Sequence, residues 1–217
     1  MKNWIFFTFL FLVACSPKRQ SPTDVAANRL CNCFSSKTVG SVDDRLTPCF
    51  QRVVTEKQKE LESTAGQEFF KGQLEKFALD VMVELTRDCD AYFREVNAMY
   101  DNSYPMDSSA FNRREIERLS KKIDAEPNQD SVKGALHKRI YRLMQMREYT
   151  DALQDIQRIE AMDSTDYRAH LAKAFLFNQT GMYDDAVLEI EKATHLSGNP
   201  NMILYAEIAK RKKAGIR

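Results

Sequence analysis

The stretch MREYTDALQDIQRIEAMD (residues 146–163) is followed later in the chain by the similar stretch TGMYDDAVLEIEKATHLS (residues 180–197). Three pairs of residues correspond at a spacing of 34: Tyr149 with Tyr183, Ala152 with Ala186, and Ile156 with Ile190. A period of this length is typical of helical repeats, in which each unit buries its apolar face against its neighbours. The C-terminal half of the chain is therefore expected to be a stack of paired α-helices.

The period and the pattern resemble those of the tetratricopeptide (TPR) family, whose repeats follow W-x2-L-G-x2-Y…A-x3-F. These five places (W, G, Y, A and F) fall on Leu136, Ile140, Leu143, Ala152 and Ile156 in the first repeat, and on His170, Ala174, Phe177, Ala186 and Ile190 in the second. A further first helix begins at about Leu204. The resemblance implies two repeats, capped by the preceding helix (residues 112–126) and the final helix (residues 201–214).

The chain departs from the family pattern at a few places. Arg139 and Lys173 stand where the family has leucine, Ile140 replaces a small residue, and Ser164 replaces the turn proline.

TPR domains generally bind peptides or other proteins along a concave face built from the first helices, which implies a protein partner here. The corresponding groove candidates are His137, Lys138, Tyr141, Met144, Gln145, Arg168, Leu171, Phe175, Asn178 and Gln179. The other interpretation is that these side chains pack against the N-terminal region or face solvent.

The chain begins with an apolar segment, although 29% of all its residues are charged. Residues 4–13 are apolar except for Thr8, and a ten-residue helix rises about 15 Å, half of a bilayer's hydrocarbon core. The segment therefore does not span a membrane, and its charged start and short apolar core are typical of a secretory signal. The residues Leu12-Val13-Ala14-Cys15 resemble the lipobox of bacterial lipoproteins.

That resemblance implies cleavage of a signal peptide (residues 1–14), acylation of Cys15, and a short tether (residues 15–20). Several acyl chains on one cysteine anchor a protein stably to a lipid bilayer. Ser16 after the cysteine favours the outer membrane of the cell envelope, and the basic residues that follow favour its periplasmic face. The alternative is an ordinary signal peptide with an incidental cysteine.

Cysteine usage follows from this assignment. Of five cysteines, lipidation of Cys15 leaves four, which are Cys31, Cys33, Cys49 and Cys89. An even number in an oxidising compartment favours two structural disulfides. A four-thiolate metal site and thiol redox chemistry are the alternatives, but the C-x-C spacing is unusual for zinc and C-x-x-C is absent.

Helical patterns indicate which cysteines meet. Ser21, with Pro22 and Asp24 after it, predicts a capped helix that runs to about residue 36. A second helix carries Cys49 near its start. Residues 66–100 are expected to form one long helix with Cys89 on its apolar stripe.

Three such helices, packed antiparallel, gather the four cysteines at one pole. Cys31 and Cys33 lie about 200° apart around the helix axis and are not expected to bond each other. Two pairings remain, in which one of them bonds Cys49 and the other bonds Cys89.

The sequence thus predicts an all-α fold. A Cys-stapled antiparallel helical bundle (residues 21–100) is followed by a linker (residues 101–110), which contains DNSYPMDSS, and by a short TPR-like α-solenoid (residues 111–217).

Composition and motifs argue against several function classes. With 32 basic and 31 acidic residues, the chain calls for no nucleic acid. The basic cluster Lys210-Arg211-Lys212-Lys213, with Arg217, is expected to be a solvated helix end. No hydrolase, metalloprotease or phosphate-loop motif occurs, so no catalytic residue and no cofactor is predicted. His137, His170 and His195 have no partner at metal-binding spacing and are expected to be surface or packing residues, so no metal is predicted.

Two functional hypotheses follow. The first is a lipid-anchored periplasmic adaptor, not an enzyme, that binds a protein or peptide partner in the envelope through its repeats. The second makes the four-cysteine domain the active module, by thiol sensing or metal binding, with the repeats structural.

Overall fold

The structure is a computed structural model that describes residues 20–62 and 67–216, with side chains described for residues 20–60 and 71–216. The predicted signal peptide, the lipidation site Cys15, residues 16–19 of the predicted tether and Arg217 lie outside the described residues. Within the described ranges the chain is all-α and has no strand, as the sequence predicts. None of the described helices combines the length and the apolar composition needed to cross a bilayer.

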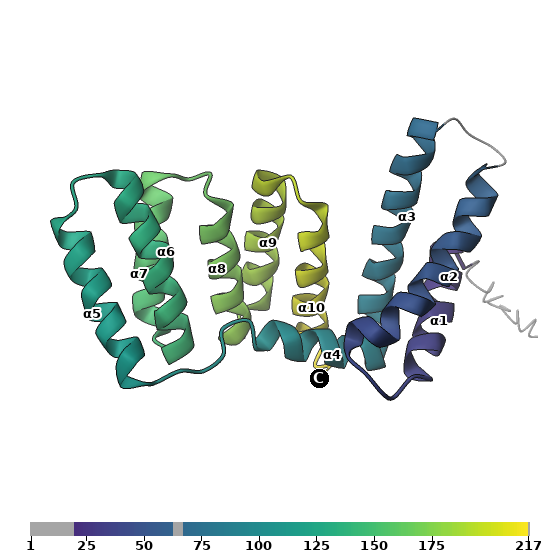
Figure 1. Cartoon of the computed structure of the whole chain (residues 1–217), viewed down its shortest axis with the longest axis horizontal. Coiled ribbons are helices and arrows are strands. Elements are labelled where there is room, and N and C mark those ends of the chain that lie inside the picture. The colour runs from purple at the N-terminus through teal and green to yellow at the C-terminus, as the bar shows by residue number, and fades with distance from the viewer. Residues whose placement is uncertain (1–19, 63–66, 217) are drawn as a thin grey trace, which may run out of the picture.

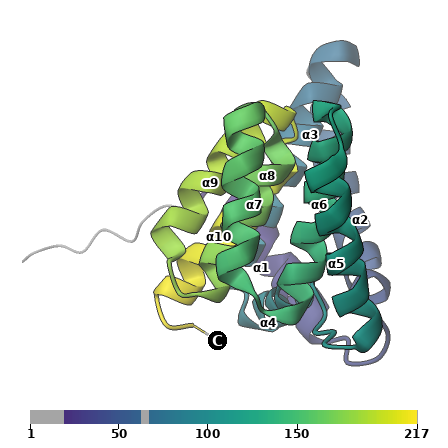
Figure 2. The same cartoon turned by 90° about the vertical axis from the view of Figure 1, so that its left-hand side faces the viewer.

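The helices form two groups joined by α4 (Figure 1). The stapled bundle consists of α1 (Pro22–Ser35), α2 (Val42–Glu62) and α3 (Gln67–Asp88). Helix α4 (Asp90–Asp101) runs from the bundle beneath the second group. That group, the helical array, consists of α5 (Ala110–Ala125), α6 (Gln129–Met146), α7 (Tyr149–Met162), α8 (Tyr167–Gln179), α9 (Tyr183–Ser197), a 3-10 turn (Pro200–Met202) and α10 (Ile203–Lys213). Figure 2 views the array from its α5 end, with α5 and α9 at opposite sides.

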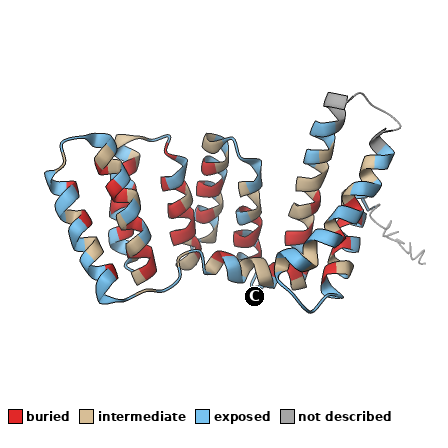
Figure 3. Cartoon of the chain, in the orientation of Figure 1, coloured by how far each residue is buried: buried red, intermediate tan, exposed pale blue. Residues whose placement is uncertain are grey.

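The stapled bundle is held at one end by both disulfides. Cys31 is bonded to Cys89 and Cys33 to Cys49, which confirms two bridges and selects one of the two predicted pairings. The predicted capping box at Ser21 is also present: its hydroxyl accepts from the backbone N–H of Asp24, whose carboxylate accepts from the Ser21 N–H. Buried side chains of the bundle gather at this disulfide-bearing end (Figure 3).

The prediction of one helix over residues 66–100 is wrong, because the helix breaks at Cys89. This residue has an extended backbone, with φ −100° and ψ 101°, and its sulfur is bonded to α1. Apolar side chains continue across the break. Tyr92, at the start of α4, still packs in the bundle core, but the side chains after it turn to the array. Val81 and Leu85 of α3 are buried in the bundle, whereas Phe93 and Tyr100 of α4 are buried in the array.

The array stacks each helix on the next, with α6 paired to α7 and α8 paired to α9. Leu136, Ile140 and Ile156 are buried in the core of the array, because apolar residues recur at helical spacing on these helices. The turns inside the two pairs also correspond: Arg147 and Gly181, 34 residues apart, have φ of 63° and 81°. Arg147 is the one non-glycine residue of the described chain with a positive φ.

The last helix of the array packs on the bundle. Helix α10 lies against α9 on one side and α3 on the other. The expectation of a solvated basic cluster at its end is wrong for Arg211, which is 5% exposed. Its guanidinium lies 4.2 Å from the Phe93 ring centroid, donates to the Thr86 carbonyl at 3.1 Å, and pairs with Asp90. Arg211 therefore joins the array to α3 and α4.

Candidate functional site

The predicted groove residues lie on α6 and α8, and part of the chain itself covers them. Tyr100, near the end of α4, packs edge-on to Phe175 at 5.4 Å and stacks on Tyr205 of α10 at 5.1 Å between ring centroids. Tyr104, just after α4, lies 4.5 Å from Phe175 and 5.5 Å from Tyr141. Five aromatic rings thus form a row from α6 to α10, and two of them come from the covering segment.

Polar contacts fix this covering segment, residues 100–107. The Asp101 carboxylate accepts from Gln179 at 3.0 Å and from Lys212 at 2.7 Å. The Asp107 N–H donates to the Gln145 carbonyl at 3.1 Å. Burial raises the pKa of the Tyr104 hydroxyl to about 12, so this ring is neutral at any physiological pH. The segment is an ordered part of the fold.

The ten groove candidates therefore have different accessibility. Met144, Gln145, Phe175 and Asn178 are buried; His137, Leu171 and Gln179 are half-buried; Lys138, Tyr141 and Arg168 are exposed. The buried four are not available to a partner in this arrangement. Of the three exposed residues, Arg168 lies at the start of α8, whereas Lys138 and Tyr141 lie at the α6 end of the row.

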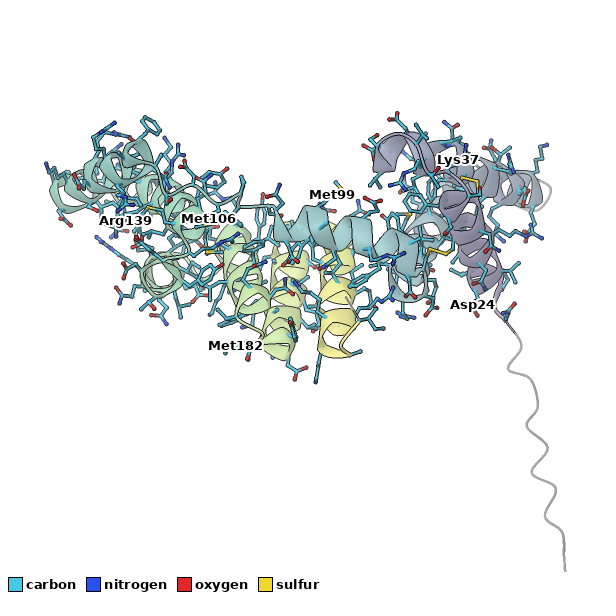
Figure 4. All side chains as sticks on the ribbon, turned by 90° about the horizontal axis from the view of Figure 1, so that it is seen from below. Asp24, Lys37, Met99, Met106, Arg139 and Met182 are labelled. Carbon is cyan, nitrogen blue, oxygen red and sulfur yellow. A yellow bond between two sulfur atoms is a disulfide. The ribbon has the colours of Figure 1, made fainter. Side chains whose placement is uncertain are left out.

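That end carries an apolar surface, which we call the aromatic patch and define as Tyr104, Met106, Phe111 and Tyr141. Met106 is 71% exposed, Phe111 59% and Tyr141 41%. The Arg142 guanidinium lies 5.8 Å from the Phe111 ring centroid and 5.7 Å from that of Tyr141. Met106, labelled in Figure 4, lies on the segment between α4 and α5. Exposed side chains of this kind, grouped around a cation, are typical of protein-binding surfaces.

At the two positions where the repeat pattern has leucine, the chain has Arg139 and Lys173, and both side chains form ion pairs between helices. In the first pair of helices, Arg139 donates twice to Asp155, at 2.7 and 2.6 Å, and Asp155 is 4% exposed. In the second, Lys173 donates to Glu160 at 2.9 Å and lies 3.5 Å from Glu189. Asp155 and Glu189 are themselves 34 residues apart. Sequence reasoning missed these acids, although a cation and an acid repeating together at that spacing were a usable signal.

A charged residue occurs once more at the 34-residue spacing, in α10, but there it is an acid and not a cation. Glu207, 34 residues after Lys173, is 4% exposed and pairs with Arg87 of α3 at 3.2 Å. In the first pair of helices, the oppositely charged partner comes from the next helix of the array; for Glu207 it comes from α3 of the bundle. The stapled bundle closes the end of the array.

Two of the histidines have carboxylate partners in the fold that their spacing in the sequence does not indicate. His137 Nε2 lies 2.9 Å from Asp166, which also caps α8 through the N–H groups of Arg168 and Ala169. Burial acts to raise the pKa of Asp166, but the hydrogen bonds from His137 and Arg168 outweigh it, so the pKa lies below its ordinary value. His195 is exposed, as expected.

His170 is the more unusual case. It is 8% exposed, and its Nδ1 lies 2.6 Å from Glu189 Oε2 and 3.4 Å from Glu160 Oε1. No sequence motif indicates this cluster, because the three residues lie on three helices and meet only when α7, α8 and α9 stack.

An open cleft of about 570 Å³ separates the bundle from the end of the array. Its lining includes Phe50, Leu79 and Met82 from the bundle, and Pro200 and Leu204 from the array. Among the described residues that line it, Glu75 and Lys76 are the titratable ones.

The four-cysteine domain offers no free thiol in this structure. All four of its cysteines are in the two disulfides, so their sulfurs cannot act as thiolate nucleophiles or metal ligands while the bonds stand. The arrangement favours the structural interpretation over thiol sensing.

Comparisons with protein-family models, curated proteins and solved structures find no match to this chain.

Proposed function

We propose that this protein is a lipid-anchored adaptor of the bacterial cell envelope, tethered through Cys15 and presenting TPR-like helical repeats to a protein partner. The paired helices with corresponding turns at Arg147 and Gly181 support the repeat assignment. The single observation that carries the binding role is the aromatic patch, because it leaves large apolar side chains in water beside the filled part of the groove. Tethering would raise the local concentration of the partner at the membrane.

The covering segment shapes this proposal. Since Tyr100 and Tyr104 already occupy the middle of the row, the partner would bind at the aromatic patch and need not displace them. Arg142 lies over the patch, and the exposed Lys138 precedes Tyr141 by about one helical turn on α6. These cations suit a partner segment that combines apolar side chains with acidic ones. The role would be non-enzymatic.

The binding role is tested by site-specific photo-crosslinking in cells. A photoreactive residue at Phe111 is expected to give one or a few discrete crosslinked proteins, and these are expected to weaken with Tyr141→Ala. The matched control is a photoreactive residue at Leu188, which is 55% exposed on α9, away from the patch. Equal crosslinking from both positions, or none from Phe111, would contradict the proposal.

The anchor is tested separately. Mass spectrometry of the N-terminal peptide is expected to show acylated Cys15 with residues 1–14 removed. A Cys15→Ala form is expected to leave the membrane fraction and to lose partners that depend on tethering. An unmodified Cys15 in the mature protein would remove the anchor from the proposal and leave the patch untouched.

A further inference from the structure

We propose that Glu160, His170 and Glu189 bind one divalent first-row transition ion of the Zn²⁺ class. The three residues come from α7, α8 and α9, and their candidate ligand atoms all lie within 4.8 Å of one another. This site would be independent of the aromatic patch.

The hydrogen bonds of His170 indicate which of its ring nitrogens could bind a metal ion. Its Nε2 lies 3.2 Å from the Ser164 carbonyl, which can only accept, so Nε2 carries a proton. A ring nitrogen fixed by a backbone carbonyl is the usual arrangement behind a metal-ligating histidine. The other nitrogen, Nδ1, then faces carboxylate oxygens of Glu189 and Glu160. Because Nδ1 and Glu189 Oε2 both carry lone pairs and lie 2.6 Å apart, a proton on one of them or a metal ion has to lie between them.

Comparison of the two repeats shows that packing alone does not require a histidine at position 170. The residue that corresponds to His170 in the first repeat is Leu136, which is fully buried. There, Arg139 and Asp155 satisfy each other without a histidine. The second repeat therefore has an additional buried nitrogen ligand where packing alone requires an apolar side chain.

Ligand geometry fits an ion of this class. Zn–N and Zn–O distances of about 2.0–2.2 Å place tetrahedral ligand atoms roughly 3.3–3.5 Å apart. The separation of 3.4 Å between His170 Nδ1 and Glu160 Oε1 meets this value, and the 2.6 Å separation from Glu189 would have to widen by about 1 Å. One imidazole and two carboxylates leave a fourth position for water. The Glu160 side chain is 20% exposed, which gives an ion access from solvent.

Lys173 is the competitor for this position. Its ammonium donates to both oxygens of Glu160, at 2.9 and 3.1 Å, and lies 3.5 Å from Glu189. Lys192 also pairs with Glu189, from the exposed side, at 2.8 Å. A bound divalent ion would replace the Lys173 ammonium as the cation between the carboxylates, and the flexible lysine side chain would turn to solvent. Removing this ammonium should therefore strengthen metal binding.

The experiment uses the chain from residue 15 onward as Cys15→Ser, untagged, with its disulfides oxidised so that no thiolate competes. Zn²⁺ is titrated by calorimetry, and Co²⁺ is added to record the ligand-field absorption of the site. Wild type is expected to bind one ion per chain. His170→Gln is expected to lower the affinity about tenfold or more, and Lys173→Met to raise it severalfold.

Matched controls keep the result specific. His195→Gln removes an exposed histidine, and Arg139→Met removes the corresponding cation of the first repeat; both are expected to leave the affinity unchanged. If His170→Gln does not fold, Glu160→Gln at the half-buried position takes its place. Absence of stoichiometric binding in both wild type and Lys173→Met, or equal losses with His170→Gln and His195→Gln, would overturn the proposal.

Discussion

The stapled bundle and the helical array are both all-α, but they solve the same stability problem with different means. Among its described side chains, the bundle's buried core gathers at the disulfide-bearing end, and covalent bonds tie its three helices and the start of α4 together. The array has no cysteine; repeated apolar faces and buried ion pairs between neighbouring helices hold it. A small bundle cannot bury enough apolar surface alone, whereas each helix added to an array extends a shared core.

The largest effect is expected from the disulfide that spans most of the bundle. Cys31→Ser/Cys89→Ser opens a loop of 58 residues, which in the chain-entropy model costs about 4 kcal/mol. The second bridge closes 16 residues and is worth about 3 kcal/mol. Segment-resolved hydrogen exchange should show loss of protection in α1 and α2, with α6 to α9 retained.

The reciprocal change lies in the array. Leu136→Ala creates a cavity at a fully buried site and is expected to cost about 3 kcal/mol. Here protection should fall first in α6 to α9. If either change deprotects the bundle and the array equally, the two regions form one cooperative unit and the comparison fails.

The next effect, about 3 kcal/mol, is expected from breaking the buried ion pair of the first repeat. Arg139→Leu places an apolar side chain in this position but leaves the Asp155 carboxylate buried and unpaired. Arg139→Leu/Asp155→Ala should recover most of the loss in a urea-unfolding double-mutant cycle. Lys173→Leu in the second repeat should cost less, because Glu189 keeps His170 and Lys192. Equal costs at the two positions would show that these partners do not compensate.

The junction between the regions should respond to Arg211. Arg211→Met removes charged hydrogen bonds to Thr86 and Asp90 and is expected to cost about 2 kcal/mol. It should also separate thermal unfolding into two transitions, since this side chain joins α10 to α3 and α4. The control is Lys210→Met on the exposed side of the same helix, expected within about 0.5 kcal/mol of wild type. A single transition in Arg211→Met would show that α3 and α10 packing alone couples the regions.

Acid should weaken the array more than the bundle. Hydrogen bonds from Lys133 and Thr165 lower the pKa of Asp163 to about 2, and the pKa values of Asp166 and Glu189 are also below their ordinary values. A lowered folded pKa contributes stability that is present above the unfolded pKa and lost as pH falls through the folded one. In the bundle the shifts oppose each other. Hydrogen bonds with Ser41 lower the pKa of Asp44, whereas burial raises the pKa of Glu84, so protonation of Glu84 favours the folded state.

Hydrogen exchange corrected for intrinsic rates, measured between pH 5 and pH 2, should therefore show array helices opening before α1 and α3. The effect is expected to be modest because water screens the partly exposed carboxylates. Earlier loss of protection in the bundle would contradict the assignment.

The sequence predicted different features in the bundle and in the array. Helical spacing predicted the helices and reduced the cysteine pairings to two, because a helix fixes the direction of each side chain. The break at Cys89 was not predictable from periodicity, since Leu85 and Phe93 lie on apolar faces that serve different cores. The repeat period predicted groove candidates on α6 and α8. It did not predict the covering of Phe175 by Tyr100 and Tyr104, because that contact depends on where α4 leads the chain. The cluster around His170 likewise appears only when three helices are stacked.

The smallest effect is expected at the two corresponding turns inside the array. Gly181 has φ of 81°, and a Cβ there would meet no atom within 4 Å, so Gly181→Ala tests backbone strain alone and should cost about 1 kcal/mol. Arg147 holds the same left-handed conformation with a side chain, so Arg147→Gly should stabilise the array by less than about 1 kcal/mol, partly offset by glycine's greater freedom in the unfolded chain. Urea midpoints of the two variants should move in opposite directions. Movement in the same direction would mean that the hydrogen bond from Arg147 to the Tyr149 hydroxyl, at 3.1 Å, outweighs the strain, and that the two turns are alike in shape but not in energy.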